Sequence, residues 1–234
     1  MMQIEENGHQ MGFLRKFMME YAGAAATKLL VEKFGDVKSK NALVFAGLGN
    51  NGGDGLVIAR HLSGYGSNVI VCLLGEPHNI RSEECSWNWN LLEKMESIKL
   101  FTDGNIEHRA KLITSHNNLD KFDIIIDGIL GTGISGEIRE PQASAIKFIN
   151  DSNAFKLAVD VPSGVDPDTG NKNSPHVVAD ITVTFHRMKV GMPKCTDVCG
   201  EIFVEKIGIP PEAEIDVLLK YIKFRWVQCR IFHT

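Results

Sequence analysis

Short, nearly continuous apolar runs recur along the chain, and the clearest lie at residues 43–46, 69–71 and 124–126. Strands that are apolar throughout are typical of parallel sheets, because helices cover both faces of such sheets. Segments in which apolar residues recur at three- and four-residue steps lie between these runs. This alternation predicts an α/β fold, a doubly wound sandwich with a mostly parallel central sheet between helical layers.

The expected elements follow from these patterns. Helices are expected over residues 11–34, 55–63, 80–97, 106–116, 142–150 and 211–222. Strands are expected over residues 43–46, 68–74, 98–101, 122–129, 155–161, 179–185 and 201–207. No internal repeat or linker separates them, so we expect residues 1–234 to form a single domain, with an apolar tail at residues 223–234 that has no clear period.

Charge and composition exclude several functional classes. The net charge is −4 and no basic run occurs, which argues against nucleic acid or an acidic membrane as the partner. No apolar run approaches the roughly 18 residues that a bilayer-spanning helix needs. The polar, acidic N-terminus does not resemble a secretion signal, so we expect a cytoplasmic protein.

The cysteines are five in number and scattered, a pattern that argues against a disulfide framework. Cys195 and Cys199, with His186 nearby, can be read as metal ligands. Their spacing matches no common zinc pattern, and thiols without a metal are the preferred interpretation.

Three polar loops follow expected strands at their carboxyl ends, where ligands bind in this architecture. They begin at residues 49, 127 and 160, and a fourth loop at residues 187–191 can close over the same pocket. Asn51, Asp127 and Ser163 would bring an amide oxygen, a carboxylate and a hydroxyl to adjacent strand ends. Oxygen ligands with a single carboxylate suit a weakly held hard cation better than zinc or calcium.

The first of these loops also satisfies the dinucleotide fingerprint, with Gly47, Gly49 and Gly52 at the required spacing. The acidic residue expected about twenty positions later is represented only by Glu76, which follows the strand rather than ending it. Asp54 would also place negative charge where a pyrophosphate binds in a simple dehydrogenase. A plain nicotinamide dehydrogenase is therefore disfavoured.

Structural interpretations of the single residues remain open. Asp54 can be a helix N-cap, Asp127 can merely close a strand, and Asp160 and Ser163 fit ordinary turn chemistry around Pro162. Only the three loops taken together indicate a binding site.

At these residues the chain resembles the NAD(P)H-hydrate epimerase family, the YjeF N-terminal-type domain. The similarity extends over roughly residues 15–212, and its motifs occur in family order. The matching segments are residues 19–23, 49–55, 127 with 131–133, 159–166, 179–185 and 208–210.

The resemblance implies a three-layer α/β/α Rossmann-like sandwich, often dimeric, with isomerase activity. Its substrates are hydrated NADH and NADPH, damaged cofactors in which water has added across a double bond of the dihydronicotinamide ring. The family interconverts the R and S epimers, so that a partner dehydratase, expected here on a separate chain, can restore the cofactor. One potassium ion per subunit is also implied.

The site residues of the family map onto this chain as follows. Asp160 is the expected catalytic residue, and Asn51, Asp127 and Ser163 are the expected potassium ligands. Substrate contacts are expected from Asn50, Asn51, Gly52, Gly53, Asp54, Gly131, Thr132, Gly133, Ile134, Ser135, Gly136, Glu137 and Asp160. The alternative is a non-catalytic nucleotide-binding or scaffold module of the same fold.

Overall fold

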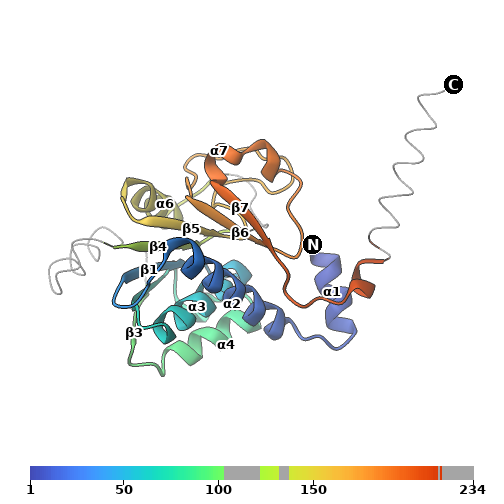
Figure 1. The fold of residues 1–234 in the computed structure, drawn as a ribbon, viewed down its shortest axis with the longest axis horizontal. Coiled ribbons are helices and arrows are strands. Elements are labelled where there is room, and N and C mark those ends of the chain that lie inside the picture. The colour runs from blue at the N-terminus through green and yellow to red at the C-terminus, as the bar shows by residue number, and fades with distance from the viewer. Residues whose placement is uncertain (103–121, 132–136, 216, 218–234) are drawn as a thin grey trace.

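The computed structural model describes residues 1–102, 122–131, 137–215 and 217 (Figure 1). Its described part contains a seven-stranded sheet in the order β3-β2-β1-β4-β5-β6-β7, with every pair of neighbours parallel. The strands are β1 (Asn41–Ala46), β2 (Asn68–Leu73), β3 (Ile98–Thr102), β4 (Ile124–Gly128), β5 (Phe155–Val159), β6 (Ile181–Phe185) and β7 (Glu201–Glu205). The predicted α/β class is confirmed.

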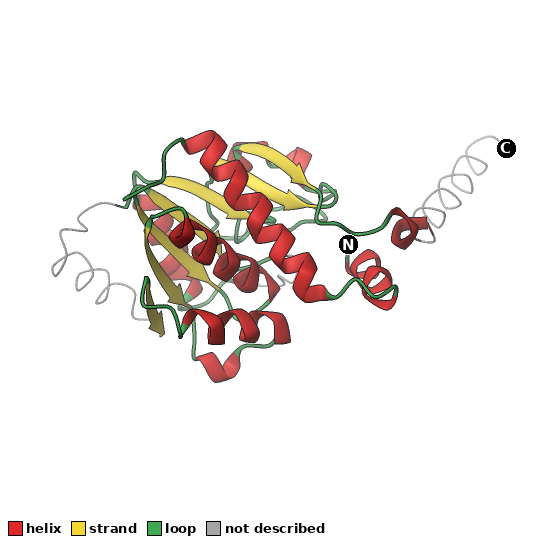
Figure 2. Cartoon of the chain, turned by 60° about the horizontal axis from the view of Figure 1, so that its bottom comes forward, coloured by secondary structure: helices red, strands yellow, loops and turns green. Residues whose placement is uncertain are grey.

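Helices cover both faces of the sheet (Figures 1 and 2). Because successive side chains of a strand point to opposite faces, Val44 packs with α2 (Arg15–Phe34), α3 (Asn50–Gly64) and α4 (Glu83–Leu92). Phe45, the next residue, packs on the other face with α6 (Gln142–Asp151). Continuous apolar strands are therefore buried on both sides, as the sequence predicts.

The winding of the sheet reverses at β1, which pairs with β2 on one edge and with β4 on the other. A crevice opens beyond the carboxyl ends of the strands at such a switch point. The segments that follow β1, β4 and β5 all meet there, and they carry Asn51, Leu130 and Asp160.

The N-terminal segment differs from expectation. The helix expected over residues 11–34 begins at Arg15, and a separate helix, α1 (Met2–Gln10), precedes it. Gly12, at φ +97°, breaks the two apart. α1 packs against η3 (Pro211–Glu214), and the Asn7 side-chain amide donates to the Ala213 carbonyl at 2.8 Å. The partner of α1 is thus remote in sequence, and local periodicity does not reveal it.

The helix expected over residues 55–63 begins earlier, at Asn50, so residues 50–54 are helical rather than a loop. Glycine disfavours helix interiors, but tight packing requires it here. A Cβ atom on Gly52 would lie 1.9 Å from the Gly47 carbonyl oxygen, and one on Gly53 would lie 2.5 Å from the Met19 methyl group. Tertiary packing therefore overrides local propensity.

The helix expected over residues 80–97 is shorter than predicted, because η1 (Pro77–Asn79) precedes it and Ser82 caps α4 by accepting from the Cys85 N–H. The chain between β6 and β7 forms η2 (Met192–Lys194) and α7 (Thr196–Cys199). The helix expected over residues 106–116, half of the one over 211–222, and the tail at 223–234 lie outside the described residues.

His186 does not join Cys195 and Cys199 in a cluster. The two thiols are buried with their sulfur atoms 3.6 Å apart, whereas the His186 ring contacts the Glu214 carboxylate at 2.6 Å. None of the helices in the described ranges combines the length and apolar character that crossing a bilayer requires.

Candidate active site

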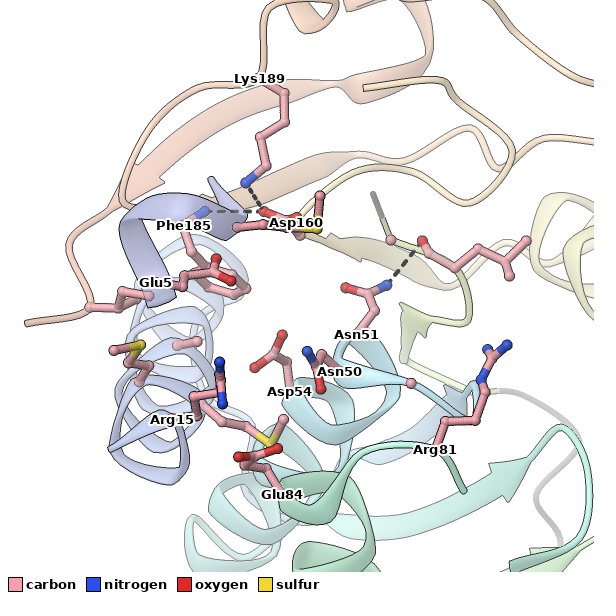
Figure 3. Close-up of a pocket in the computed structure, with 18 of the residues that line it drawn as sticks. Glu5, Arg15, Asn50, Asn51, Asp54, Arg81, Glu84, Asp160, Phe185 and Lys189 are labelled. Carbon is pink, nitrogen blue, oxygen red and sulfur yellow. Dashed lines mark hydrogen bonds and ion pairs between the residues drawn. The ribbon is translucent and has the colours of Figure 1, made fainter. Parts of the chain in front are cut away.

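A cavity of about 350 Å³ lies beyond the carboxyl ends of the strands (Figure 3). It brings together α1, the first turns of α2 and α3, and the loops that follow β1, β2, β4, β5 and β6. Its polar lining residues are Glu5, Arg15, Asn50, Asn51, Asp54, Arg81, Glu84, Asp160 and Lys189.

Close backbone stacking builds the floor of the cavity. A Cβ atom on Gly47 would lie 1.9 Å from the Ile129 carbonyl oxygen, so the loops after β1 and β4 touch through their main chains. Gly49 is the N-cap of α3 and has no side chain to satisfy the first N–H groups of the helix. These groups lack intrahelical partners and can bind an anionic ligand.

Asn51 lies on this floor with an exposed fraction of 8%. Its side-chain amide donates to the Leu130 carbonyl at 3.1 Å. Its carbonyl oxygen, Oδ1, is buried and has no hydrogen-bond partner among the described residues. A buried amide oxygen without a partner is costly, and a bound cation or a ligand donor would satisfy it.

Asp127 and Ser163 lie beside Asn51, joined to it through Leu130. The Ser163 hydroxyl donates to Asp127 Oδ1 at 2.5 Å, the Ser163 N–H donates to Oδ2 at 2.8 Å, and the Leu130 N–H donates to the Ser163 hydroxyl at 2.9 Å. Burial raises the pKa of Asp127 to about 6, although the hydrogen bonds from Ser163 and Ile129 oppose the shift. The three oxygen-bearing residues predicted from distant loops therefore lie within one hydrogen-bonded group.

Asp160 follows β5 directly and adopts a left-handed backbone conformation with φ 65°. Such a conformation costs about 1–3 kcal/mol in a residue other than glycine and is concentrated at functional sites. The Asp160 N–H donates to the Val183 carbonyl at 2.8 Å, which fixes the turn. The side chain points into the cavity (Figure 3).

Lys189 is the main site residue that the sequence did not single out by itself, although its loop was expected to close over the pocket. Its ammonium group donates to Asp160 Oδ1 and, at 3.0 Å, to the Thr184 hydroxyl, which in turn donates to Oδ1 at 3.1 Å. The exposed side-chain fractions of Lys189 and Asp160 are 6% and 15%. The pair is therefore a partly buried ion pair with little solvent screening.

Asp54 lies inside α3 and lines the cavity, so the interpretation that it is merely the N-cap is wrong. Burial raises the pKa of Asp54 well above its usual range, and the charges of Asp160 and Glu5 raise it further. Its carboxyl group therefore takes up a proton at a higher pH than an exposed aspartate does, and a protonated carboxyl group does not repel an anion. Glu76, by contrast, is exposed and does not line the cavity.

Three further lining residues were not named as site residues from the sequence. Glu5 comes from the unexpected helix α1, and Phe185 is the last residue of β6. Arg81 follows β2, and its position after a strand at the switch point was the one clue available. Of the loop at residues 131–137, Gly131 lines the cavity and Glu137 is exposed. Thr132, Gly133, Ile134, Ser135 and Gly136 lie outside the described residues.

Comparison with known proteins places the chain in a family. The family described as YjeF-related protein N-terminus matches residues 15–191. The chain belongs to this family. The resemblance recognised in the sequence is thereby confirmed, and the match includes Asn51, Asp127, Asp160 and Lys189 but leaves out α1 and η3.

Named relatives agree with the family. An NAD(P)H-hydrate epimerase from Nitrosopumilus maritimus (strain SCM1) is 61% identical over 219 residues, 93% of this chain and 97% of that protein. One from Cenarchaeum symbiosum (strain A) is 58% identical, with the same coverage of both chains. The bifunctional NAD(P)H-hydrate repair enzyme Nnr of Methanothermobacter thermautotrophicus is 46% identical over 89% of this chain, which spans 39% of that protein.

A solved structure shows the same fold. The crystal structure of the yeast protein YNL200c matches with a TM-score of 0.68 at 25% sequence identity, covering 85% of this chain and 82% of that one.

Proposed function

We propose that this chain is an NAD(P)H-hydrate epimerase, an isomerase that interconverts the R and S epimers of hydrated NADH and NADPH. The observation that carries the proposal is the environment of Asp160. A carboxylate on a left-handed turn, paired with a buried lysine, faces a cavity at the switch point of the sheet. It does so in a chain 61% identical to a protein named for this activity.

The reaction requires modest chemistry. In the hydrated cofactor a hydroxyl group is attached to the ring carbon beside the nitrogen. The nitrogen lone pair expels this hydroxyl, which leaves as water once protonated, and a planar cation remains that water can re-enter from either face. Asp160 transfers the proton at the departing and returning oxygen, and its charge stabilises the cation. Lys189 and Thr184 fix the position of Asp160 by binding Oδ1.

The rest of the substrate is held by main-chain and cationic groups. The free N–H groups at the start of α3 would bind phosphate, and the raised pKa of Asp54 would favour its protonated form, which donates a hydrogen bond rather than repelling the phosphate. Of the lining cations, Arg15 pairs with Glu6 and Lys189 with Asp160, whereas Arg81 has no carboxylate partner among the described residues. We assign Arg81 to the diphosphate. The loop at residues 131–137 completes the proposed contacts.

A potassium ion fits the group formed by Asn51, Asp127 and Ser163. Asn51 Oδ1 is buried without a partner, and Asp127, with an exposed fraction of 1%, has no cationic partner in the described ranges. These residues would hold the ion, one per subunit. When bound, it would orient substrate oxygens and stiffen the three loops rather than act as a strong Lewis acid.

Other parts of the proposal concern partners. A dehydratase that restores the cofactor would complete the repair. The bifunctional relative, of which this chain spans 39%, supports the coupling to a second repair activity. The homodimer and the cytoplasmic location stay predictions. A non-catalytic scaffold module is the rival function, and the retained pairing of Asp160 with Lys189 disfavours it.

Substitution of Asp160 tests the function. We expect Asp160→Asn to lower the rate of epimer interconversion about 100-fold or more, measured by chromatography from a single epimer, because the group that transfers the proton is lost. Asp168→Asn, the same change at an exposed loop position, should leave the rate unchanged. If Asp160→Asn retains more than about a tenth of the wild-type turnover, Asp160 is not the catalytic residue.

A further inference from the structure

Helix α1 presents a carboxyl group to the cavity that the reaction described so far does not use. Glu5 lines the same cavity as Asp54 and Asp160, and Figure 3 shows the three side chains converging on one space from α1, α3 and the end of β5. The adjacent Glu6 instead pairs with Arg15. Among the described residues, no hydrogen bond or ion pair engages the Glu5 carboxyl group, which leaves it available to a ligand.

The position of Glu5 is fixed by the packing of α1. Ile4 is buried in the same core cluster as Met18, and a Cβ atom on Gly8 would lie 3.0 Å from the Met18 methyl group. Asn7 ties the helix to η3 through its bond to Ala213. Glu5 is therefore held at the wall of the cavity by the contacts of α1 with α2 and η3, in a segment outside the family match.

The electrostatic surroundings favour a protonated Glu5. Burial raises the pKa of Glu5, and the negative charge of Asp160 raises it further. Lys189, the amino terminus and Arg15 oppose the shift, and Glu5 in turn raises the pKa of Asp54. The two carboxyl groups differ in environment, because the buried ammonium group of Lys189 pairs with Asp160 and balances its negative charge. Glu5 has no such ion-pair partner among the described residues.

Epimerisation by loss and return of water involves both faces of the ring. Water must leave from one face and re-enter from the opposite face for the configuration to invert. A carboxyl group on one wall reaches only one face unless the ring turns over inside the cavity. Two carboxyl groups on different walls can serve the two faces without such a movement.

We propose that Glu5 is the second acid–base residue of this site and serves the ring face opposite to Asp160. The inference rests on the proposed function. Protonated Glu5 donates its proton to the hydroxyl, the carbon–oxygen bond breaks, and water leaves as the nitrogen lone pair forms the planar cation. A water molecule then adds to the same carbon from the other face and gives its proton to the Asp160 carboxylate. The reverse reaction exchanges the two roles, and solvent returns the proton between turnovers.

The test compares Glu5→Gln with the wild type and with Glu96→Gln, the same change at an exposed position that does not line the cavity. Turnover and KM are measured from each single epimer, above the rate without enzyme, across pH. We expect Glu5→Gln to lower kcat about 100-fold in both directions with KM nearly unchanged. Glu96→Gln should behave as the wild type.

The pH profile separates catalysis from packing. The active form carries a proton on Glu5, so wild-type activity should fall as pH rises through the pKa of Glu5, which burial raises. The activity of Glu5→Gln should no longer fall at high pH. Glu5→Asp keeps a carboxyl group, so it should recover part of the turnover and again lose activity at high pH. Asp54, Lys189, Arg15 and the amino terminus are unchanged in all three variants.

Two results overturn the inference: a Glu5→Gln variant with wild-type kcat, or one whose KM alone rises. Failure of Glu5→Asp to restore any turnover also counts against it. These outcomes are distinct from failure of the proposed function, in which the wild-type protein itself would not interconvert the epimers.

Discussion

Replacing Lys189 with methionine tests how the site is held together. Methionine keeps most of the apolar stem of lysine and removes the ammonium group that binds Asp160 Oδ1 and the Thr184 hydroxyl. Asp160 would keep weaker bonds, from the Thr184 hydroxyl at 3.1 Å and the Phe185 N–H at 3.4 Å. A carboxylate with an exposed side-chain fraction of 15% would then lack a compensating charge.

The expected cost follows from this burial. Breaking a buried ion pair by removing one partner typically lowers the free energy of unfolding by about 3–5 kcal/mol, because the remaining charge stays desolvated. Since Asp160 is partly open to the cavity, we expect the lower end, about 3 kcal/mol. For a chain of this size that corresponds to a decrease in Tm of about 6–12 °C.

A double-mutant cycle isolates the pair. Unfolding by urea and by heat is compared for Lys189→Met, Asp160→Asn and the double variant, which should recover at least about 2 kcal/mol relative to the sum of the single changes. Lys172→Met is the matched control. Lys172 pairs with Asp197, but the exposed side-chain fractions are 37% and 61%, so its loss should cost less than about 1 kcal/mol.

Two outcomes would contradict this prediction: Lys189→Met destabilises the protein no more than Lys172→Met does, or the effects of the two single changes simply add. Either result would mean that solvent in the cavity screens Asp160 and that Lys189 does not hold the catalytic turn in place.

Two further predictions concern ligands. Arg81→Ala should raise KM for the hydrated cofactor about tenfold or more with little change in kcat, because a charge-assisted contact to phosphate is worth roughly 1.5–3 kcal/mol in both ground and transition states. Steady-state kinetics compare this variant with Lys28→Ala, a change at an exposed position remote from the cavity. An unaltered KM would remove Arg81 from the diphosphate site. Epimerase activity should rise with potassium in place of a bulky organic cation, and Asp127→Ala should abolish that response; indifference to both changes would refute the proposed ion.

Local patterns were sufficient to predict the architecture. Runs such as Ile124, Ile125 and Ile126 can be stable only when covered on both faces, and that requirement implies helices on each side of a parallel sheet. The order of the sheet then brings the carboxyl ends of β1, β4 and β5 together. The convergence of Asn51, Asp127, Ser163 and Asp160 is therefore largely a consequence of chain topology.

Helix boundaries and partners were not predictable in the same way. α3 begins at Asn50 despite its glycines, because Gly52 and Gly53 lie against the main chain and side chain of other segments. α1 has no strong local signal, since its stability comes from contacts with η3 and α2. Consequently Glu5 could not be assigned to the site from its position in the sequence.

The amino-acid sequence by itself determined the layered fold, the edge of the sheet at which the cavity lies, and the oxygen-bearing residues at that edge, because each depends on local hydrophobic pattern and chain order. The tertiary structure decided which charges face one another. Lys189 meets Asp160 and Thr184, and Asp54 becomes a buried acid, only after segments that are distant along the chain exclude water from the same cavity. Burial and the distance to neighbouring charges determine how these groups pair and in which direction their pKa values shift, and neither can be read from local sequence.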